Sequence, residues 1–146
     1  MSAKLLQLTN PSIGTVAVDA NLPFGVTTIS YPKACNGCNE TYSVVYSGSD
    51  TVRINKSGTY RVIYNASLVA TDAGNLVLEL VVNGTTKYTV TSIATAGGSV
   101  NITLPFELYL PCNCASNPAN IPVYIQVKNT GVAVTSGTSN LIISKE

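Results

Sequence analysis

Four cysteines are the residues of this chain whose type and spacing could do chemistry. They form two close pairs, Cys35 with Cys38 and Cys112 with Cys114, each set among asparagines. If the two pairs meet, four thiolates could hold a zinc ion in the tetrahedral geometry of a structural site. Two disulfides, or thiols that either stay unpaired or cross-link subunits, are the alternatives that spacing alone leaves open. In each case we expect the role of these residues to be structural.

Groups for catalysis are scarce. The chain has no histidine, which removes the usual general base and the pairs in which it activates a serine or a cysteine. The seven acidic residues show no spacing that would bring two carboxylates together by local geometry. Gly97-Gly98 precedes a strand pattern rather than a helix, so it is no phosphate-binding loop. The sequence therefore predicts a protein that is not an enzyme, with structural zinc as the only candidate cofactor.

Composition limits the partners. Charged residues make up 10% of the chain and the net charge is +1, without a basic run that could neutralise phosphates. No apolar run approaches the roughly 20 residues of a membrane-spanning helix, and the first residues lack the apolar region of a signal peptide. We therefore expect no nucleic acid partner, no membrane partner and no secretion signal.

The elements that position these groups are expected to be strands. Apolar and polar residues alternate along 59–70, 99–110 and 121–129, which is the period of pleated strands that cover a core. β-Branched residues and Tyr dominate the apolar clusters, and no segment shows helical spacing over three turns. The expected fold class is all-β, a two-sheet sandwich, with strands near residues 4–9, 26–31, 41–46, 51–55, 59–70, 75–82, 85–95, 99–110, 121–129, 131–135 and 138–144.

The length of 146 residues fits one domain. Within a single domain of residues 1–146, we expect residues 1–10 to be either an anchor to a larger particle or the first strand. Residues 32–40 are expected to form a loop that carries the first cysteine pair. Pro105 interrupts a strong strand pattern, so its strand should bulge there or lie at a sheet edge.

Asn83-Gly84 predicts a two-residue hairpin turn, because both positions of a type I′ turn need positive φ. The expected register pairs Val81 with Thr86, Glu79 with Tyr88 and Val77 with Val90, on the face opposite to Leu76, Leu78 and Leu80. Apolar groups on both faces indicate contact with another subunit, although a loop of the same chain could also cover them. Tyr60 and Tyr64 are expected in the core. The predicted subunit-interface residues are Val77, Val81, Tyr88, Val90, Tyr109 and Tyr124.

Several segments resemble the tumour necrosis factor-like, or complement-head-like, jelly-roll family, in the bacterial and phage branch that includes the heads of exosporium collagen-like glycoproteins. The resemblance is carried by Val52-Arg53-Ile54, Ser57-Gly58-Thr59-Tyr60, Val62-Ile63-Tyr64, the segment from Leu76 to Gly84, Val134-Thr135-Ser136 and Asn140-Leu141-Ile142-Ile143, with 16–24 similar to the family's first strand and loop. It implies a jelly roll of about ten strands that forms a compact homotrimer with Tyr-rich subunit contacts.

The resemblance, together with the low charge and the lack of catalytic groups, implies a non-enzymatic trimeric knob on a particle surface. Without a collagen-like stalk or an exosporium-targeting leader, the chain is expected to be a phage virion component, such as a head fibre, decoration or tail-tip protein. A spore-surface protein and a carbohydrate-binding module that uses Tyr31 or Tyr42 are the alternatives. The expected partners are copies of the chain itself, a virion or spore coat, and a surface glycan. The expected location is the surface of a virion, spore or cell.

Overall fold

The computed structural model describes residues 3–30, 44–46, 48–56, 58–110 and 122–145, and its regular elements are all strands. The part of the chain so described forms β1 (Ala3–Ile13), β2 (Ala20–Asn21), β3 (Val26–Ser30), β4 (Val44–Tyr46), β5 (Val52–Ile54), β6 (Gly58–Ala70), β7 (Gly74–Val82), β8 (Thr85–Ala94), β9 (Ser99–Leu110), β10 (Val123–Asn129) and β11 (Val134–Lys145). The predicted all-β fold class is confirmed.

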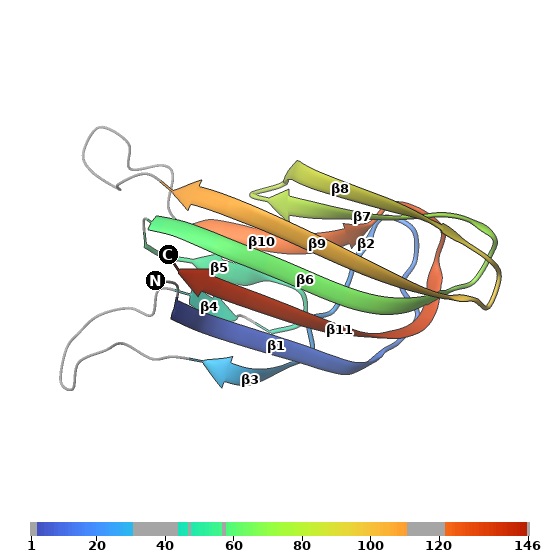
Figure 1. The fold of residues 1–146 in the computed structure, drawn as a ribbon, viewed down its shortest axis with the longest axis horizontal. Coiled ribbons are helices and arrows are strands. Elements are labelled where there is room, and N and C mark those ends of the chain that lie inside the picture. The colour runs from blue at the N-terminus through green and yellow to red at the C-terminus, as the bar shows by residue number, and fades with distance from the viewer. Residues whose placement is uncertain (1–2, 31–43, 47, 57, 111–121, 146) are drawn as a thin grey trace.

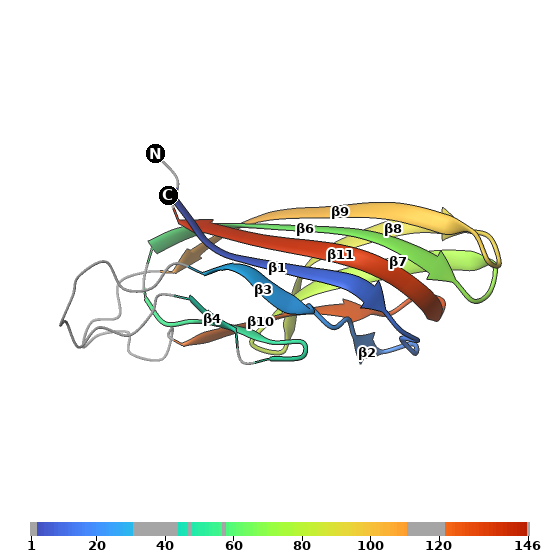
Figure 2. The same ribbon diagram turned by 90° about the horizontal axis from the view of Figure 1, so that it is seen from below.

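The strands form two antiparallel sheets (Figure 1). Sheet A has the order β3-β1-β11-β6-β9, and sheet B has the order β4-β5-β10-β7-β8 with β2 paired beside β10. Figure 2 shows the sheets as two layers that face each other along their length. Strands that are distant in the chain become neighbours, since β11 lies between β1 and β6. This arrangement is the two-sheet jelly roll that the sequence predicts.

The core lies between the two sheets and is built from alternate residues of each strand. Along β6, Tyr60 and Tyr64 point inward and are fully buried, whereas Arg61 and Asn65 are exposed. Phe24, from the connection between β2 and β3, packs edge-on against Tyr64 with ring centroids 6.0 Å apart. The prediction that Tyr60 and Tyr64 are core residues is confirmed, and their aromatic area contributes strongly to the core.

The first strand is an inner strand of sheet A. β1 pairs with both β3 and β11, and its Leu6 and Leu8 are buried in the core. Of residues 1–10, which were expected to be either an anchor or the first strand, those from Ala3 onward belong to strand β1. At the other side of the sheet, β9 is the edge strand and pairs with β6 without a register shift at Pro105. Its edge position explains how a strand can hold a proline, which donates no ladder bond.

The hairpin at Asn83-Gly84 forms as predicted, and both residues have positive φ. Val81 pairs with Thr86 as expected, but a register shift between Leu80 and Val81 follows. One extra residue of β8 is accommodated at this irregularity, which turns every later side chain of β8 to the other face.

The register shift corrects the predicted face of the hairpin. Tyr88 lies opposite Leu80 and Val90 opposite Leu78, so both share the core-facing side of sheet B. Val77 and Val81 remain on the outward side, with Val77 half-buried and Val81 buried. The expectation that these four predicted interface residues share one outward face is therefore wrong, because a bulge intervenes.

Two strands differ from the expected set. The strands expected at 131–135 and 138–144 are one strand, β11, whose register with β6 shifts between Val134 and Ser136. The short strand β2 was not expected, because its two residues carry no alternation that a sequence pattern could detect.

Gly137 of β11 lies where two strands approach closely. A Cβ on Gly137 would lie 2.5 Å from the carbonyl oxygen of Ser67 and 3.2 Å from the Cα of Leu68, so the backbone would have to move. We expect Gly137→Ala to lower the free energy of unfolding by about 2 kcal/mol. Gly14→Ala is the matched control, since nothing lies within 4 Å of a Cβ there, and it should be neutral or slightly stabilising. Urea unfolding of both variants at one protein concentration checks this; equal midpoints would contradict the close approach.

Candidate functional site

The outward face of sheet A carries neutral polar residues in rows across its strands. Asn65 of β6 lies opposite Asn140 of β11 on one side and Thr103 of β9 on the other. The next row holds Ser67, flanked by Thr138 and Asn101. These rows line a groove of about 490 Å³ whose lining residues carry no charge. The groove offers amide and hydroxyl groups for hydrogen bonding and no group for acid–base chemistry.

An apolar row lies beside this groove. Ile63 of β6 stands opposite Ile142 of β11 and Pro105 of β9, and both isoleucines are half-buried. The charged pair Arg61 and Glu107 follows in the next row, with 3.2 Å between Arg61 Nη2 and Glu107 Oε1. The two charges neutralise each other. This face therefore combines an apolar centre with neutral polar flanks, as the core of a protein interface does.

The outward face of sheet B is more highly charged. Glu79 of β7 lies opposite Lys128 of β10, and its carboxylate accepts hydrogen bonds from Thr86 Oγ1 at 2.6 Å and Thr130 Oγ1 at 2.7 Å. These two hydrogen bonds, with the charge of Lys128, hold the pKa of Glu79 below its usual value. The carboxylate thus stays ionised. Glu79 therefore acts as a hydrogen-bond acceptor on a surface of the kind that faces water. An ionised carboxylate does not serve as a catalytic acid.

The β8–β9 edge closes one side of the sandwich. Tyr88 and Phe106 bring their rings to a centroid distance of 6.4 Å, and Val90 packs against the core next to them. Tyr88 nevertheless stays 38% exposed. The edge therefore presents an aromatic side chain that is anchored by the core and open to a partner.

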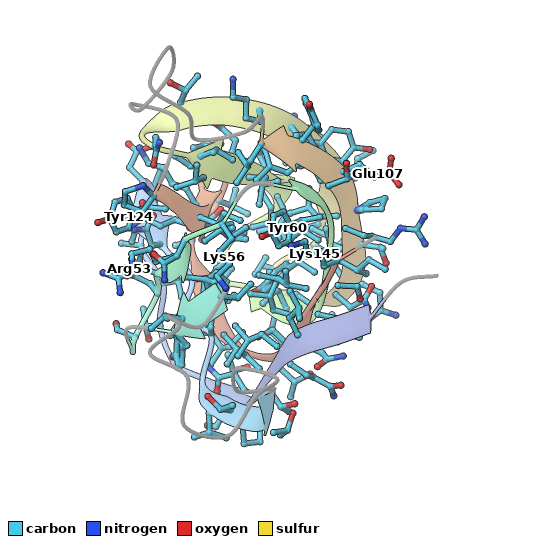
Figure 3. The ribbon with its side chains drawn as sticks, turned by 90° about the vertical axis from the view of Figure 1, so that its left-hand side faces the viewer. Arg53, Lys56, Tyr60, Glu107, Tyr124 and Lys145 are labelled. Atoms are coloured by element: carbon cyan, nitrogen blue, oxygen red, sulfur yellow. The ribbon has the colours of Figure 1, made fainter. Side chains whose placement is uncertain are left out.

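One end of the core is closed by Tyr60 and Lys145, which Figure 3 shows between the two sheets. The Tyr60 hydroxyl donates a hydrogen bond to the Lys56 carbonyl oxygen at 2.7 Å, and Lys145 Nζ lies 5.9 Å from the centre of the ring. Burial raises the pKa of Tyr60 to about 12. A phenol with such a pKa remains protonated at neutral pH, so this cluster stabilises the fold and provides no nucleophile.

The predicted site residues lie in separate regions. Cys35, Cys38, Cys112 and Cys114 fall outside the described residues, as do Tyr31 and Tyr42, so the zinc, disulfide and free-thiol alternatives all stay predictions. Tyr109 is 70% exposed on the outward face of sheet A, and Tyr124 is 44% exposed on that of sheet B. Both tyrosines therefore point away from the core. The interface role of all six predicted residues stays a prediction.

Sequence reasoning missed the row of Ile63 and Ile142. The two residues are far apart in the chain and meet because β6 and β11 are neighbours in sheet A. Each is an apolar residue at an otherwise mostly polar outward position of its strand, and this was the signal that could have identified them.

None of the described residues belongs to a helix that could cross a membrane. No protein-family model matches the chain, and no curated protein matches it.

The chain has the tumour necrosis factor-like jelly-roll fold. Eiger, a tumour necrosis factor from S. frugiperda, superposes with a TM-score of 0.68 at 13% identity, over 98% of this chain and 92% of that one. The vertex protein of phage PRD1 superposes with a TM-score of 0.62 at 17% identity, over 99% of this chain and 98% of that one. The globular domain of zebrafish complement 1qA superposes with a TM-score of 0.64 at 8% identity, over 97% of this chain and 95% of that one. The predicted fold is thus confirmed over nearly the whole chain.

Proposed function

We propose that this protein is a non-enzymatic structural or attachment subunit that forms a homotrimeric knob on the surface of a particle. The observation that carries the proposal is the outward face of sheet A. Ile63, Ile142 and Pro105 form its apolar centre, and its described charged side chains, Arg61 and Glu107, pair with each other. Such a face loses little solvation when another copy covers it.

The contrast between the two sheets favours sheet A as the contact face. Sheet B presents Arg53, Glu79 and Lys128 outward, and burying these charges would cost free energy. Of the interface residues predicted from the sequence, Tyr109 belongs to the sheet A face and Tyr88 and Val90 to the β8–β9 edge. Val77, Val81 and Tyr124 belong to sheet B, and they define the competing contact face.

A virion is the particle that we propose. The support is the likeness in fold to the vertex protein of phage PRD1, together with a chain in which only 10% of residues are charged and none is histidine. A phage head fibre, decoration or tail-tip protein fits these properties, and a spore-surface protein is the alternative.

A native mass measurement on the purified chain tests the oligomeric state. We expect a species of three times 15.2 kDa that persists on dilution. A species of 15.2 kDa at micromolar concentration would refute the proposal. Immunogold labelling of purified particles then tests the location, and particles without label would refute a virion role.

We propose a structural role for Cys35, Cys38, Cys112 and Cys114, as a zinc site or as disulfides. The chain should be produced with and without added zinc, then subjected to metal analysis and thiol titration under denaturing conditions. Zinc near one equivalent per chain, released by a chelator together with a fall in the melting temperature, identifies the metal site. Fewer than four titratable thiols without zinc identifies disulfides. Four titratable thiols, no metal and an unchanged melting temperature after Cys→Ser substitution would refute both.

A further inference from the structure

A shallow pocket of about 300 Å³ opens on the outward face of sheet B. Tyr124, Gln126 and Lys128 alternate along β10 and all point to this face. Gln126 and Lys128 line the pocket together with Asp19 and Asn21. The pocket thus presents amide, carboxylate and ammonium groups side by side, a set that can both donate and accept hydrogen bonds.

Tyr124 stands next to the pocket on a fixed backbone. Its N–H donates a hydrogen bond to Asn83 Oδ1 at 2.8 Å, and its carbonyl oxygen accepts one from the Asn83 N–H at 2.9 Å. Asn83 precedes Gly84, which lines the pocket. The ring is 44% exposed, and Figure 3 shows it projecting from the sandwich. Such a ring is a rigid platform on which a flat apolar surface can stack.

Arg53 lies beside this ring with an unsatisfied donor. It pairs with Tyr124 across β5 and β10, and Figure 3 shows the two side chains on the same side of the sandwich. The Arg53 Nε is enclosed and has no hydrogen-bond acceptor among the described residues. Because Nε is enclosed, a ligand carboxylate would have to pair with the terminal Nη groups of this half-buried side chain, which can donate two parallel hydrogen bonds.

Hydrogen bonds fix the polar groups further along β10. Gln126 Nε2 donates to Thr51 Oγ1 at 2.9 Å, and Asn21 Nδ2 donates to Asp50 Oδ2 at 3.0 Å. The amide planes are therefore held in place before any ligand arrives, which lowers the entropy cost of binding. Asp19, Asp50 and Glu79 beside them repel every anion, and a polyanion such as a nucleic acid most strongly, so an acidic sugar has to place its one carboxylate at Arg53.

We propose that Arg53, Tyr124, Gln126 and Lys128, here named the β10 strip, bind an oligosaccharide that carries a carboxylate. One sugar ring stacks its C–H face on Tyr124, its hydroxyls bond the amide and acid groups of the pocket, and the carboxylate of the acidic sugar pairs with Arg53. The β10 strip lies on the sheet opposite to the proposed trimer face. A trimer built through sheet A would carry three such sites outward, and their combined avidity would exceed the affinity of one.

The test uses the full chain on a glycan array that contains neutral, sialylated and uronic-acid oligosaccharides. Titration of lactose and of its sialylated derivative in solution then compares a neutral ligand with an acidic one. We expect retention of carboxylate-bearing members, at least a tenfold weaker affinity after Tyr124→Ala, and loss of the preference for acidic over neutral sugar after Arg53→Gln. Ile93→Ala is the control, since Ile93 is 83% exposed on β8, away from the pocket lining.

Each outcome decides the proposal. No retention of any glycan, equal affinity for acidic and neutral members, or binding that survives both Tyr124→Ala and Arg53→Gln would overturn it. Circular dichroism and native mass of each variant show that the fold and the oligomeric state are retained. A monomer that binds acidic glycans would refute the proposed trimer and support the glycan site. A trimer that binds no glycan would support the proposed trimer and refute the glycan site.

Discussion

Ile63→Arg is expected to convert the trimer into monomers without unfolding the sandwich. Ile63 is half-buried at the centre of the outward face of sheet A, opposite Ile142 and Pro105. An arginine there can reach water in the monomer, but in the trimer it would be desolvated without a partner. That penalty is about 4 kcal/mol or more for each contact, or roughly a thousandfold in the association constant. Native mass should therefore fall from three chains to one at micromolar concentration, with an unchanged circular dichroism spectrum.

Val77→Arg is the matched control for this experiment. Val77 is also half-buried on a strand, but it faces outward from sheet B. If sheet A forms the contact, this variant stays trimeric. If Val77, Val81 and Tyr124 form the subunit contact, as the sequence pattern indicates, Val77→Arg becomes monomeric and Ile63→Arg stays trimeric. A wild-type trimer that neither substitution dissociates would contradict both assignments.

Alkaline unfolding is the second large expected effect. Burial raises the pKa of Tyr64 to about 12, against a small lowering by Ser139, and burial likewise raises that of Tyr60 to about 12. Both groups have an unperturbed pKa of 10.0, so the unfolded chain loses these protons first. Stability is therefore fully present below pH 10 and is lost as the pH rises towards 12. For Tyr64 the loss amounts to roughly 3 kcal/mol, a large part of a typical domain's stability.

Two tyrosine variants separate the contributions. The Tyr64 hydroxyl is buried and has no hydrogen bond of good geometry within the described part of the chain, even though Ser139 is near it. Tyr64→Phe should therefore leave stability at pH 7 unchanged or higher and shift the alkaline midpoint upward. Tyr60→Phe removes the hydrogen bond to the Lys56 carbonyl and should cost about 1 kcal/mol at pH 7. Urea unfolding across pH 7 to about 12 measures both effects. An unshifted alkaline midpoint in Tyr64→Phe would show that this phenol does not control the transition.

The sequence was sufficient for the strands that have one buried face. Alternation along β6, β9 and β10 is strict because each residue faces either the core or the outside. The Asn83-Gly84 turn was equally readable, because few dipeptides accept positive φ at two successive positions.

The remaining features depend on non-local pairing. The bulge next to Val81 turns Tyr88 and Val90 from the expected outward face to the core-facing side of sheet B. No residue of β8 indicates this bulge in the sequence. Ile63 and Ile142 become one surface only when β6 and β11 become neighbours. The proposed glycan site likewise joins Arg53 of β5 to Tyr124 of β10. Pattern analysis of a single strand contains no information on such cross-strand partners.

The position of β11 has a consequence for biosynthesis. This strand, residues 134–145, fills the gap between β1 and β6 and is synthesised after the other described strands of sheet A. Until it is released, sheet A consists of two separated fragments whose strand edges and apolar side chains remain uncovered. Sheet A can then close only after β11 has been made, and until then its unpaired edges are open to association with other chains.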